Sequence, residues 1–309
     1  MVNIKTKIDM KGHYDVAVIH ADGTRDDYKN MENLIVNQGK DCLGGLFPSG
    51  YQSGLGGIVV GVGNATPAVT DIALQNPLAV SNNSTAFSET APSLLAPYQT
   101  MASQTFTFAV GAVIGNIAEI GLTILKTAGI AATDAVFSRA LIQVGGSPGT
   151  ITVTATDQLV ATYTITYTFT ADISGSINVT TNGTPVAVSY TGRPMNLGIT
   201  TASVSNPVSH YVGQLAASGW HVFSSTATSF SATNSQPAQH INSVSTSAAA
   251  YTGGSFTRTF TSTWNTGSPF SDRMYAVAFS GMVNMQILFA SAIGPLTTQT
   301  MTFQFTYSW

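Results

Sequence analysis

The clearest pattern in the chain is an alternation of apolar and hydroxyl side chains over residues 150–169, TITVTATDQLVATYTITYTF. Over its second half one face is apolar and the other consists of threonine. The two sets are Ala161, Tyr163, Ile165, Tyr167 and Phe169 against Thr162, Thr164, Thr166 and Thr168. A period of two is that of a β-strand with one buried face. We therefore predict a long, half-buried strand over residues 150–169.

The last residues of the chain, 298–309, repeat this alternation as TQTMTFQFTYSW. Two segments closed by the same kind of strand suggest two β domains of related plan. The alternative is that any amphipathic strand has this pattern, because the similarity is short and compositional.

Residues 1–11 are polar, alternating and free of glycine, which predicts an extended N-terminal arm of the kind that lies across a neighbour in assemblies. Residues 12–25 read as a strand that ends at the Asp22-Gly23 turn. A helix is predicted over 30–42, where apolar side chains follow helical spacing. Asn30 is its expected cap and Gly44-Gly45 its expected stop.

Further along, apolar runs and alternation predict strands over 58–62, 105–113 and 136–144. Residues 66–74 are expected to form one helical turn capped by Thr66. Residues 75–101, rich in proline and asparagine, are expected to be a loop.

Beyond Asp172, short strands alternate with long loops rich in serine, threonine and asparagine. The strands are expected over 176–181, 186–190, 221–230, 255–264, 274–279, 283–289 and 298–309. Asn182-Gly183 would join the first two as a hairpin. The long loops span 195–220 and 231–254, and loops of this length are usually functional or packed against something.

These elements predict an all-β fold: two β-sandwich or jelly-roll-like modules in tandem, with one short N-terminal helix and an extended arm. The expected boundaries are 1–12 for the arm, 13–172 for the first module and 173–309 for the second module with its long polar loops.

Charge is scarce in this chain of 309 residues. Only 8% of the residues are charged, against the usual value of roughly 25%, and serine and threonine make up nearly a quarter. A surface of hydroxyls and amides repels its own copies weakly, which favours a permanent assembly. Residues 1–45 hold six of the eleven basic and seven of the fourteen acidic side chains.

The same composition argues against several partners. A net charge of −3 with no run of Lys or Arg argues against nucleic acid. The single cysteine, Cys42, excludes an intrachain disulfide, and we expect it to be a buried hydrophobe. The N-terminus has no apolar run that would make a signal peptide. The apolar stretch 106–125 is interrupted by glycines and Glu119, so strands are favoured over a membrane span.

No pattern of catalytic or metal-binding residues stands out. The carboxylates of the first half, Asp71, Glu89, Glu119, Asp134 and Asp157, are scattered singly, whereas glycoside hydrolysis uses a facing pair. The five histidines show no metal-ligand spacing. Gly61-Val62-Gly63 lacks the third glycine of a dinucleotide fingerprint, because position 66 is Thr. We therefore expect no cofactor, no metal and no enzymatic activity.

Two sets of residues remain as candidates for a role. Tyr211, Trp220 and Tyr251 lie in or beside the long polar loops and are candidates for surface recognition of a glycan or protein. Filling the sandwich core is the alternative for aromatics on strands. Glu119 and Arg139 are lone charges in apolar, strand-like blocks, and a buried charge needs a partner. We expect these two to pair, within the fold or across a subunit boundary.

Four blocks of the first half carry a resemblance. They are NLIV at 33–36 with Gly39, GIVVGVGNATPAVTDIALQNPL at 57–78, IAEIGL at 117–122 and FSRALI at 137–142. In this order they resemble structural proteins of tailed-bacteriophage virions, over about residues 13–170. No such resemblance covers residues 173–309.

The resemblance implies a non-enzymatic, β-rich part of the virion, made in the host cytoplasm, that packs with copies of itself and with other virion proteins in a ring or fibre. A tail or neck position is the leading interpretation. A host receptor-binding module of tail-fibre or spike type, which would bind a cell-surface glycan or protein, is one alternative. A head decoration or head-fibre protein is the other.

Overall fold

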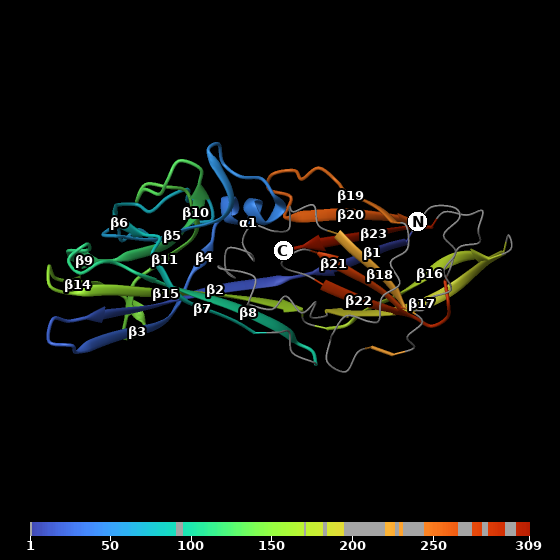
Figure 1. Ribbon diagram of the computed structural model, residues 1–309, viewed down its shortest axis with the longest axis horizontal. Helices are drawn as coiled ribbons and strands as arrows, with labels where there is room; N and C mark the ends of the chain where they lie inside the picture. The colour runs from blue at the N-terminus through green and yellow to red at the C-terminus, as the bar shows by residue number, and fades with distance from the viewer. Residues whose placement is uncertain are drawn as a thin grey trace.

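A computed structural model of the chain shows an all-β, sandwich-like fold drawn out along one axis (Figure 1). It describes residues 2–90, 95–169, 171–181, 184–194, 220–225, 229–230, 244–264, 274–279, 284–293 and 301–309. Within these ranges one helix occurs, α1 (Asn37–Gly44), and it lies midway along the molecule. The predicted fold class, all-β with a single short helix, is confirmed.

The first sheet is antiparallel and carries the predicted long strand at its centre. Its order is β3 (Arg25–Glu32), β2 (Asp9–Ile19), β15 (Gln158–Phe169), β8 (Tyr98–Thr107) and β7 (Ser84–Thr90). Residues of β15 alternate between buried and half-buried along its whole length, as predicted.

The twenty-residue strand is nevertheless shorter than predicted. Thr154 donates from its backbone N and its Oγ1 to Asp157 Oδ2, at 2.7 Å each, and this turn interrupts the strand. The preceding residues form β14 (Ile151–Val153), which pairs with β9 (Gly115–Ile117) in a separate two-stranded sheet.

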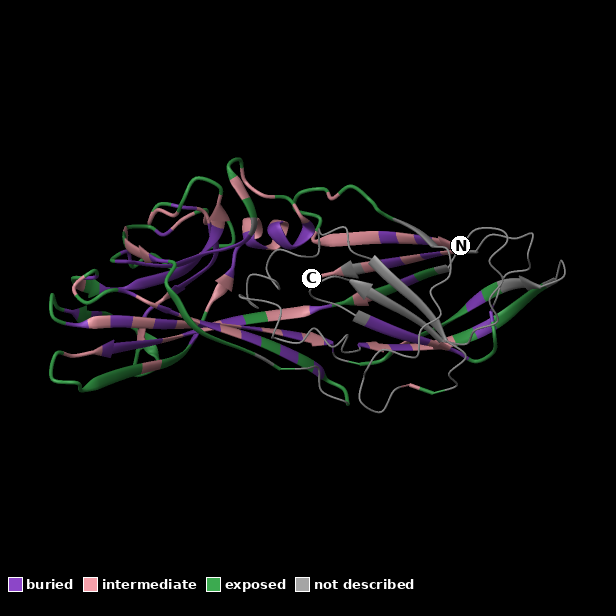
Figure 2. Ribbon diagram, in the orientation of Figure 1, coloured by how far each residue is buried: buried purple, intermediate pink, exposed green. Residues whose placement is uncertain are grey.

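The second sheet faces the first. Its order is β4 (Leu34–Ile35), β11 (Val136–Leu141), β10 (Glu119–Lys126), β5 (Tyr51–Gly61) and β6 (Pro77–Ser81), and a small hairpin of β12 (Gln143–Val144) and β13 (Ser147–Pro148) follows β11. A contact between the two sheets buries Tyr14, whose Oη lies 2.7 Å from Ser138 Oγ on β11, and the Tyr14 ring packs on Tyr163 of the same sheet. Figure 2 shows the buried residues between the sheets.

Two further sheets form the other part of the molecule. One has the order β1 (Val2–Lys7), β23 (Met301–Ser308), β20 (Thr257–Trp264) and β19 (Val244–Ala248); the other has β16 (Ile173–Thr181), β17 (Thr184–Pro194), β22 (Asn284–Phe289), β21 (Met274–Phe279) and β18 (Trp220–Ser225). Buried apolar side chains of β1, β16, β17, β20, β22 and β23 belong to the same continuous core as those of the first two sheets.

The N-terminal arm is extended, but its contacts differ from those we predicted. Residues 2–7 form β1, which pairs in parallel with β23 of the same chain, from Val2 opposite Phe303 to Lys7 opposite Ser308. Ile4 and Ile8 are buried, so the arm contributes apolar side chains to the core. The division of the chain at residue 172 stays a prediction.

The two strands that suggested a duplication have different neighbours. β15 lies between two antiparallel strands, whereas β23 lies between parallel β1 and antiparallel β20. The positions of β15 and β23 in their sheets are therefore not equivalent.

The helix predicted over 30–42 is wrong at its start. Asn30 has a φ of 57°, in the left-handed region, and its backbone N donates to Asp15 Oδ1. Met31 and Ile35 instead belong to strands β3 and β4, where their apolar side chains are buried. The helix begins at Asn37 and ends at Gly44, where left-handed Gly45 stops it as expected.

Several predicted loops and strands are also corrected. Residues 75–101 hold β6, β7 and the start of β8. Pro77 is the first residue of β6 and Pro97 directly precedes β8, and a missing N–H is tolerated at strand ends. Residues 66–74 form non-helical turns, and the strand expected over 105–113 ends at Thr107. Within the expected loop 231–254, residues 244–248 form β19.

Strands of the second half lie where they were predicted, within a few residues at their ends. The turn Asn182-Gly183 and residues 195–219 of the first long loop lie outside the described residues. In the part that the structure describes, no helix is both long enough and apolar enough to cross a membrane.

Candidate functional site

The loop between β5 and β6, residues 62–76, folds over the outer face of the second sheet, and we call it the clamped loop. Beneath it lies a small apolar cluster, separate from the main core, in which Leu74 of the loop packs with Val36, Val59 and Val136. Gly121 on β10 leaves room for this contact, because a Cβ there would lie 3.0 Å from Leu74 Cδ2.

Glu119 and Arg139 pair within the chain, on this same outer face. Arg139 Nε and Nη2 each lie 2.9 Å from Glu119 Oε2, and the two side chains are 3% and 0% exposed. The register explains their meeting: Gly121 pairs with Arg139, and Glu119 is two residues from Gly121 on the same face of β10.

The Glu119 carboxylate also accepts three backbone hydrogen bonds from the clamped loop. Oε1 accepts from the N–H of Gly63 at 3.0 Å and of Asn76 at 2.7 Å, and Oε2 accepts from the N–H of Gln75 at 3.0 Å. One buried carboxylate thus holds both ends of the loop, and its hydrogen-bonding capacity is met without water.

Arg139 holds the middle of the loop. Its Nη1 donates to Asp71 Oδ2 at 2.7 Å, and its Nη2 donates to the carbonyl of Ala65 at 2.9 Å. Asp71 Oδ2 in turn accepts from the N–H of Ala68, which closes the turn that replaces the expected helical turn. Sequence reasoning missed Asp71 as the third charged member.

Two glycines leave space for the Glu119 side chain. A Cβ at Gly63 would lie 2.4 Å from Glu119 Oε1, and one at Gly61 would lie 2.7 Å from the same atom and 2.5 Å from the carbonyl of Asn76. Gly61 and Gly63, which lack the third glycine of a dinucleotide fingerprint, therefore serve to let the backbone approach the Glu119 carboxylate closely.

Apolar side chains of the clamped loop point outward while its backbone is fixed. Ile72 is 70% exposed, yet its carbonyl accepts from Gln38 Nε2 at 2.7 Å and from the N–H of Val136 at 3.1 Å. Val69 is 43% exposed, and its carbonyl accepts from the N–H of Asn37. The loop thus presents apolar surface that is already ordered.

The four sequence blocks behind the resemblance converge on this site. Block 57–78 supplies the loop and its glycines, block 117–122 supplies Glu119 and Gly121, and block 137–142 supplies Arg139. From block 33–36 with Gly39, Gly39 packs on β11, where a Cβ would lie 2.1 Å from the Phe137 carbonyl.

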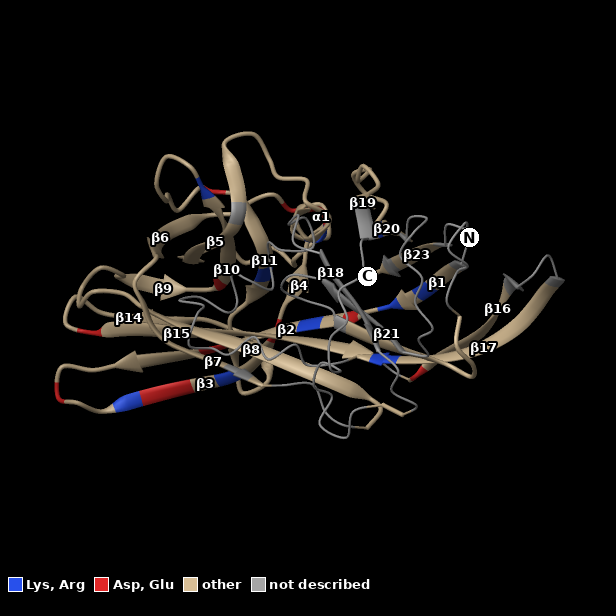
Figure 3. Cartoon of the chain, turned by 45° about the vertical axis from the view of Figure 1, so that its right-hand side comes forward, with Lys and Arg blue, Asp and Glu red and all other residues tan. Residues whose placement is uncertain are grey.

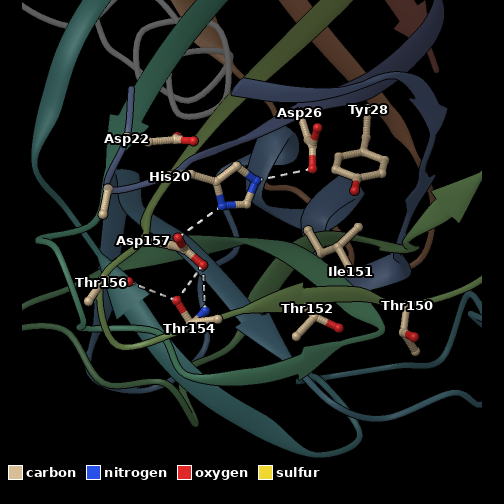
Figure 4. Close-up of a pocket in the computed structure, with 11 residues that line it drawn as sticks. His20, Asp22, Asp26, Tyr28, Thr150, Ile151, Thr152, Thr154, Thr156 and Asp157 are labelled. Atoms are coloured by element: carbon tan, nitrogen blue, oxygen red, sulfur yellow. Dashed lines mark hydrogen bonds and ion pairs between the residues drawn. The ribbon is translucent and has the colours of Figure 1, made fainter. Parts of the chain in front are cut away.

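A second feature is a pocket of about 680 Å³ between β3 and β14, at the end of the molecule that lies opposite the N-terminus (Figures 1 and 4). His20 lies at its centre, with Nδ1 2.9 Å from Asp157 Oδ1 and Nε2 3.1 Å from Asp26 Oδ2. The remaining wall is formed by Tyr28, by Asp22 and by threonines around β14.

Hydrogen bonds set the protonation of this group. Those from His20 to Asp26 and Asp157 raise the pKa of the imidazole above 6.5, because both carboxylates accept hydrogen bonds from the charged form and so stabilise it. Hydrogen bonds from Thr154, and then from His20, lower the pKa of Asp157. The cationic form of His20 therefore joins β3 to the turn before β15.

The three aromatic candidates for surface recognition have different outcomes. Tyr211 lies outside the described residues, and Trp220 is the first residue of β18, with its side chain outside the description. Tyr251 is half-buried: its Oη donates to Asp41 Oδ1 at 2.7 Å and its ring stacks on Trp309. Burial, followed by the bond to Asp41, raises the pKa of Tyr251 to about 12.

Tyr251 therefore joins the C-terminal end of the chain to helix α1. Asp41 Oδ1 also accepts from the N–H of Gly254, and Trp309 Nε1 donates to the carbonyl of Lys40. The phenol and the ring of Tyr251 are thus both engaged within the chain, and its role in recognition stays a prediction.

No group of three or more His, Cys, Asp or Glu side chains suited to a metal ion occurs among the residues that the structure describes. Cys42 is buried on α1, and burial raises the pKa of its thiol to about 12. A thiol in this state is a weak nucleophile.

No protein-family model, no curated protein and no solved structure matches the chain.

Proposed function

We propose that the chain is a non-enzymatic structural component of a tailed-bacteriophage virion, associated with the tail or neck, and that it works by symmetric self-assembly. The phage assignment rests on the resemblance of the four sequence blocks. Support for a contact role comes from the clamped loop: one of those blocks supplies the loop itself, and two supply Glu119 and Arg139 on the strands beneath it.

The observation that carries the proposal is the contrast within the clamped loop between a fixed backbone and outward apolar side chains. Three backbone N–H groups are bound by Glu119, while Ile72 and Val69 are exposed. Exposed apolar surface marks contact sites, and a loop that is ordered in advance loses little entropy when a partner binds.

Scarcity of charge supports the same proposal. Figure 3 shows Lys, Arg, Asp and Glu concentrated on β2, β3 and nearby loops, with most of the remaining ribbon free of them. Residues 173–309 contain one acidic and three basic side chains. Surfaces with so little charge do little to keep copies apart.

Quantitative mass spectrometry of purified particles whose genome encodes this chain tests the virion assignment. We expect the chain in the particles at a fixed ratio to the other structural proteins, and labelling on intact particles would separate tail or neck from head decoration or head fibre. Absence of the chain from washed particles would contradict the assignment.

A variant tests the role of the clamped loop. Ile72→Asp should reduce incorporation into particles while the free protein keeps its unfolding midpoint, since the side chain is exposed. Ile114→Asp, at a side chain that is 56% exposed outside the loop, is the matched control. Equal incorporation of the two variants would remove the loop from the contact.

Host recognition is the second candidate function, and the pocket at His20 is the observation that favours it. Carboxylates, threonine hydroxyls and Tyr28 line this pocket, and such groups suit a glycan or a polar peptide. Binding of the labelled full chain to host cells, with loss of binding in Tyr28→Ala, would support this function. Equal cell binding of both proteins would exclude the pocket.

A further inference from the structure

The two outer strands of the first sheet differ sharply in charge. β3, RDDYKNME, carries five charged side chains in eight residues, whereas β7, STAFSET, carries one, Glu89. Charged side chains along an outer strand prevent another chain from adding to the sheet. The β3 edge is therefore protected, and the β7 edge lacks this protection.

The β7 edge is also exposed and partly apolar. Residues 84–88 are exposed, with Phe87 at 44%, and Met101 on the neighbouring β8 is 41% exposed. Phe87 pairs with Gln104 and Thr90 pairs with Met101, so the two apolar side chains lie on opposite faces of the sheet. A strand added to this edge would cover apolar surface on both faces.

The two outer strands of the second sheet are less open to such an addition. β6 begins with Pro77, which has no N–H to donate, and β4 has only two residues. Pairing between β7 and β8 is irregular only between Ser84 and Ala86, so residues 86–90 form a regular strand. Among the outer strands of the first and second sheets, β7 is therefore the best edge for pairing.

We propose that two copies of this chain pair through β7, antiparallel to each other across a two-fold axis at residue 87 or 88, so that the first sheets of both copies become one. This rests on the self-assembly that we propose above. A second copy fits because serine, threonine and alanine predominate in the strand, so mostly small uncharged side chains would face each other. Because β3 is charged, the joined sheet ends after two copies and forms a closed dimer, not a fibre.

Sedimentation velocity of the full chain tests this pairing. The double variant Ala86→Lys, Ser88→Lys places like charges on both edges, and we expect it to remove the dimer with the unfolding midpoint unchanged. The matched control is Ala128→Lys, Ala155→Lys, which adds the same charge at exposed turns and should leave the dimer intact.

Cysteine cross-linking decides the case even if the lysine variant fails to fold. Cα atoms opposite each other in an antiparallel pair are about 4.5–5.5 Å apart, within the range of a disulfide. Mild oxidation of Phe87→Cys or Ser88→Cys should give a covalent dimer, and Val144→Cys, an exposed site away from β7, should not. Cys42 is buried and does not compete.

The outcomes separate the two proposals. A wild-type oligomer that survives the lysine variant, with no cross-link at 87 or 88, overturns pairing through β7 but leaves self-assembly standing. A chain that stays monomeric at every concentration overturns both. Loss of the dimer in the lysine variant, together with cross-linking of the cysteine variants at 87 or 88, supports pairing of two copies. If β7 binds an added unrelated peptide but copies of the chain do not bind each other through it, the pairing is overturned.

Discussion

Arg139 and Glu119, on neighbouring strands β11 and β10, form an ion pair with almost no access to solvent: two guanidinium nitrogens lie 2.9 Å from one carboxylate oxygen. Both side chains also bind the clamped loop. Glu119 accepts hydrogen bonds from three backbone N–H groups, and Arg139 donates to Asp71 and to the carbonyl of Ala65. The pair therefore fixes the clamped loop to the sheet.

Removing the cation should be costly. Arg139→Met leaves the Glu119 carboxylate buried without its counter-charge, and breaking such a pair costs about 3–5 kcal/mol. We expect a loss of this size in the free energy of unfolding, measured with denaturant. The double variant Arg139→Met, Glu119→Gln should lose less than the single one, because the amide at position 119 carries no charge while its oxygen still accepts hydrogen bonds from the loop N–H groups.

Arg25→Ala is the matched control, since it removes the exposed pair with Asp27, whose side chains are 52% and 39% exposed. Exposed pairs contribute about 0–1 kcal/mol. Equal losses for Arg139→Met and Arg25→Ala would mean that the buried pair does not hold the loop.

Gly63→Ala tests the close approach of the loop to Glu119. A Cβ at this position would lie 2.4 Å from Glu119 Oε1, so the carboxylate or the loop must move. We expect a loss of about 1–3 kcal/mol in unfolding free energy, typical of overpacking. Gly149→Ala, where the nearest atom is a Val144 side-chain carbon at 3.2 Å, should cost clearly less.

His20 should make stability depend on pH. Its folded-state pKa is raised above 6.5, so its contribution is complete below pH 6.5 and is lost as pH rises through the folded-state value. Asp157, with a lowered pKa, contributes above 3.8, and that contribution is lost as pH falls through its folded-state value. Stability measured upward from pH 6.5 should therefore decline in the wild type.

His20→Gln should flatten this decline, and His13→Gln is the control for the loss of one histidine. Other charges face His20 as well: Asp26 lies on β3, Asp22 on the adjoining turn and Asp157 before β15. The same slope in both variants would contradict a role for His20 in the pH dependence.

Tyr251→Phe should weaken the contact between the C-terminal end and α1. The change removes the bond from the phenol to Asp41 Oδ1 while the ring can still stack on Trp309, so we expect a loss of about 1 kcal/mol. Denaturant unfolding measures the loss. The control is Tyr28→Phe, which removes the hydroxyl of another half-buried tyrosine, in the His20 pocket. If Tyr251→Phe lost no more unfolding free energy than Tyr28→Phe, the contact between Tyr251 and α1 would be contradicted.

Local patterns were sufficient for much of the fold. Alternation alone placed β15, because a two-residue period has one structural meaning when one face is apolar. The start of the helix was predicted too early because Met31 and Ile35, four residues apart, fit both a helical period and a strand period. In the folded chain these residues belong to strands β3 and β4. Asp71 escaped notice because its partner, Arg139, is 68 residues away and no local signal joins them.

The pairing of Glu119 with Arg139 was predictable, since a lone charge in an apolar strand requires a counter-charge. The role of Tyr251 was not, because its contacts are with Asp41, 210 residues away. Parallel pairing of β1 with β23 joins the two ends of the chain, and no pattern within either segment indicates such a distant partner.

Sedimentation velocity of the full chain over a wide range of concentration tests the central claim most directly. An assembly protein with an ordered apolar loop and an unprotected sheet edge should form a discrete oligomer as concentration rises, and the oligomer should persist at high salt because few charges are involved. A single monomeric species at every concentration and salt would contradict the account.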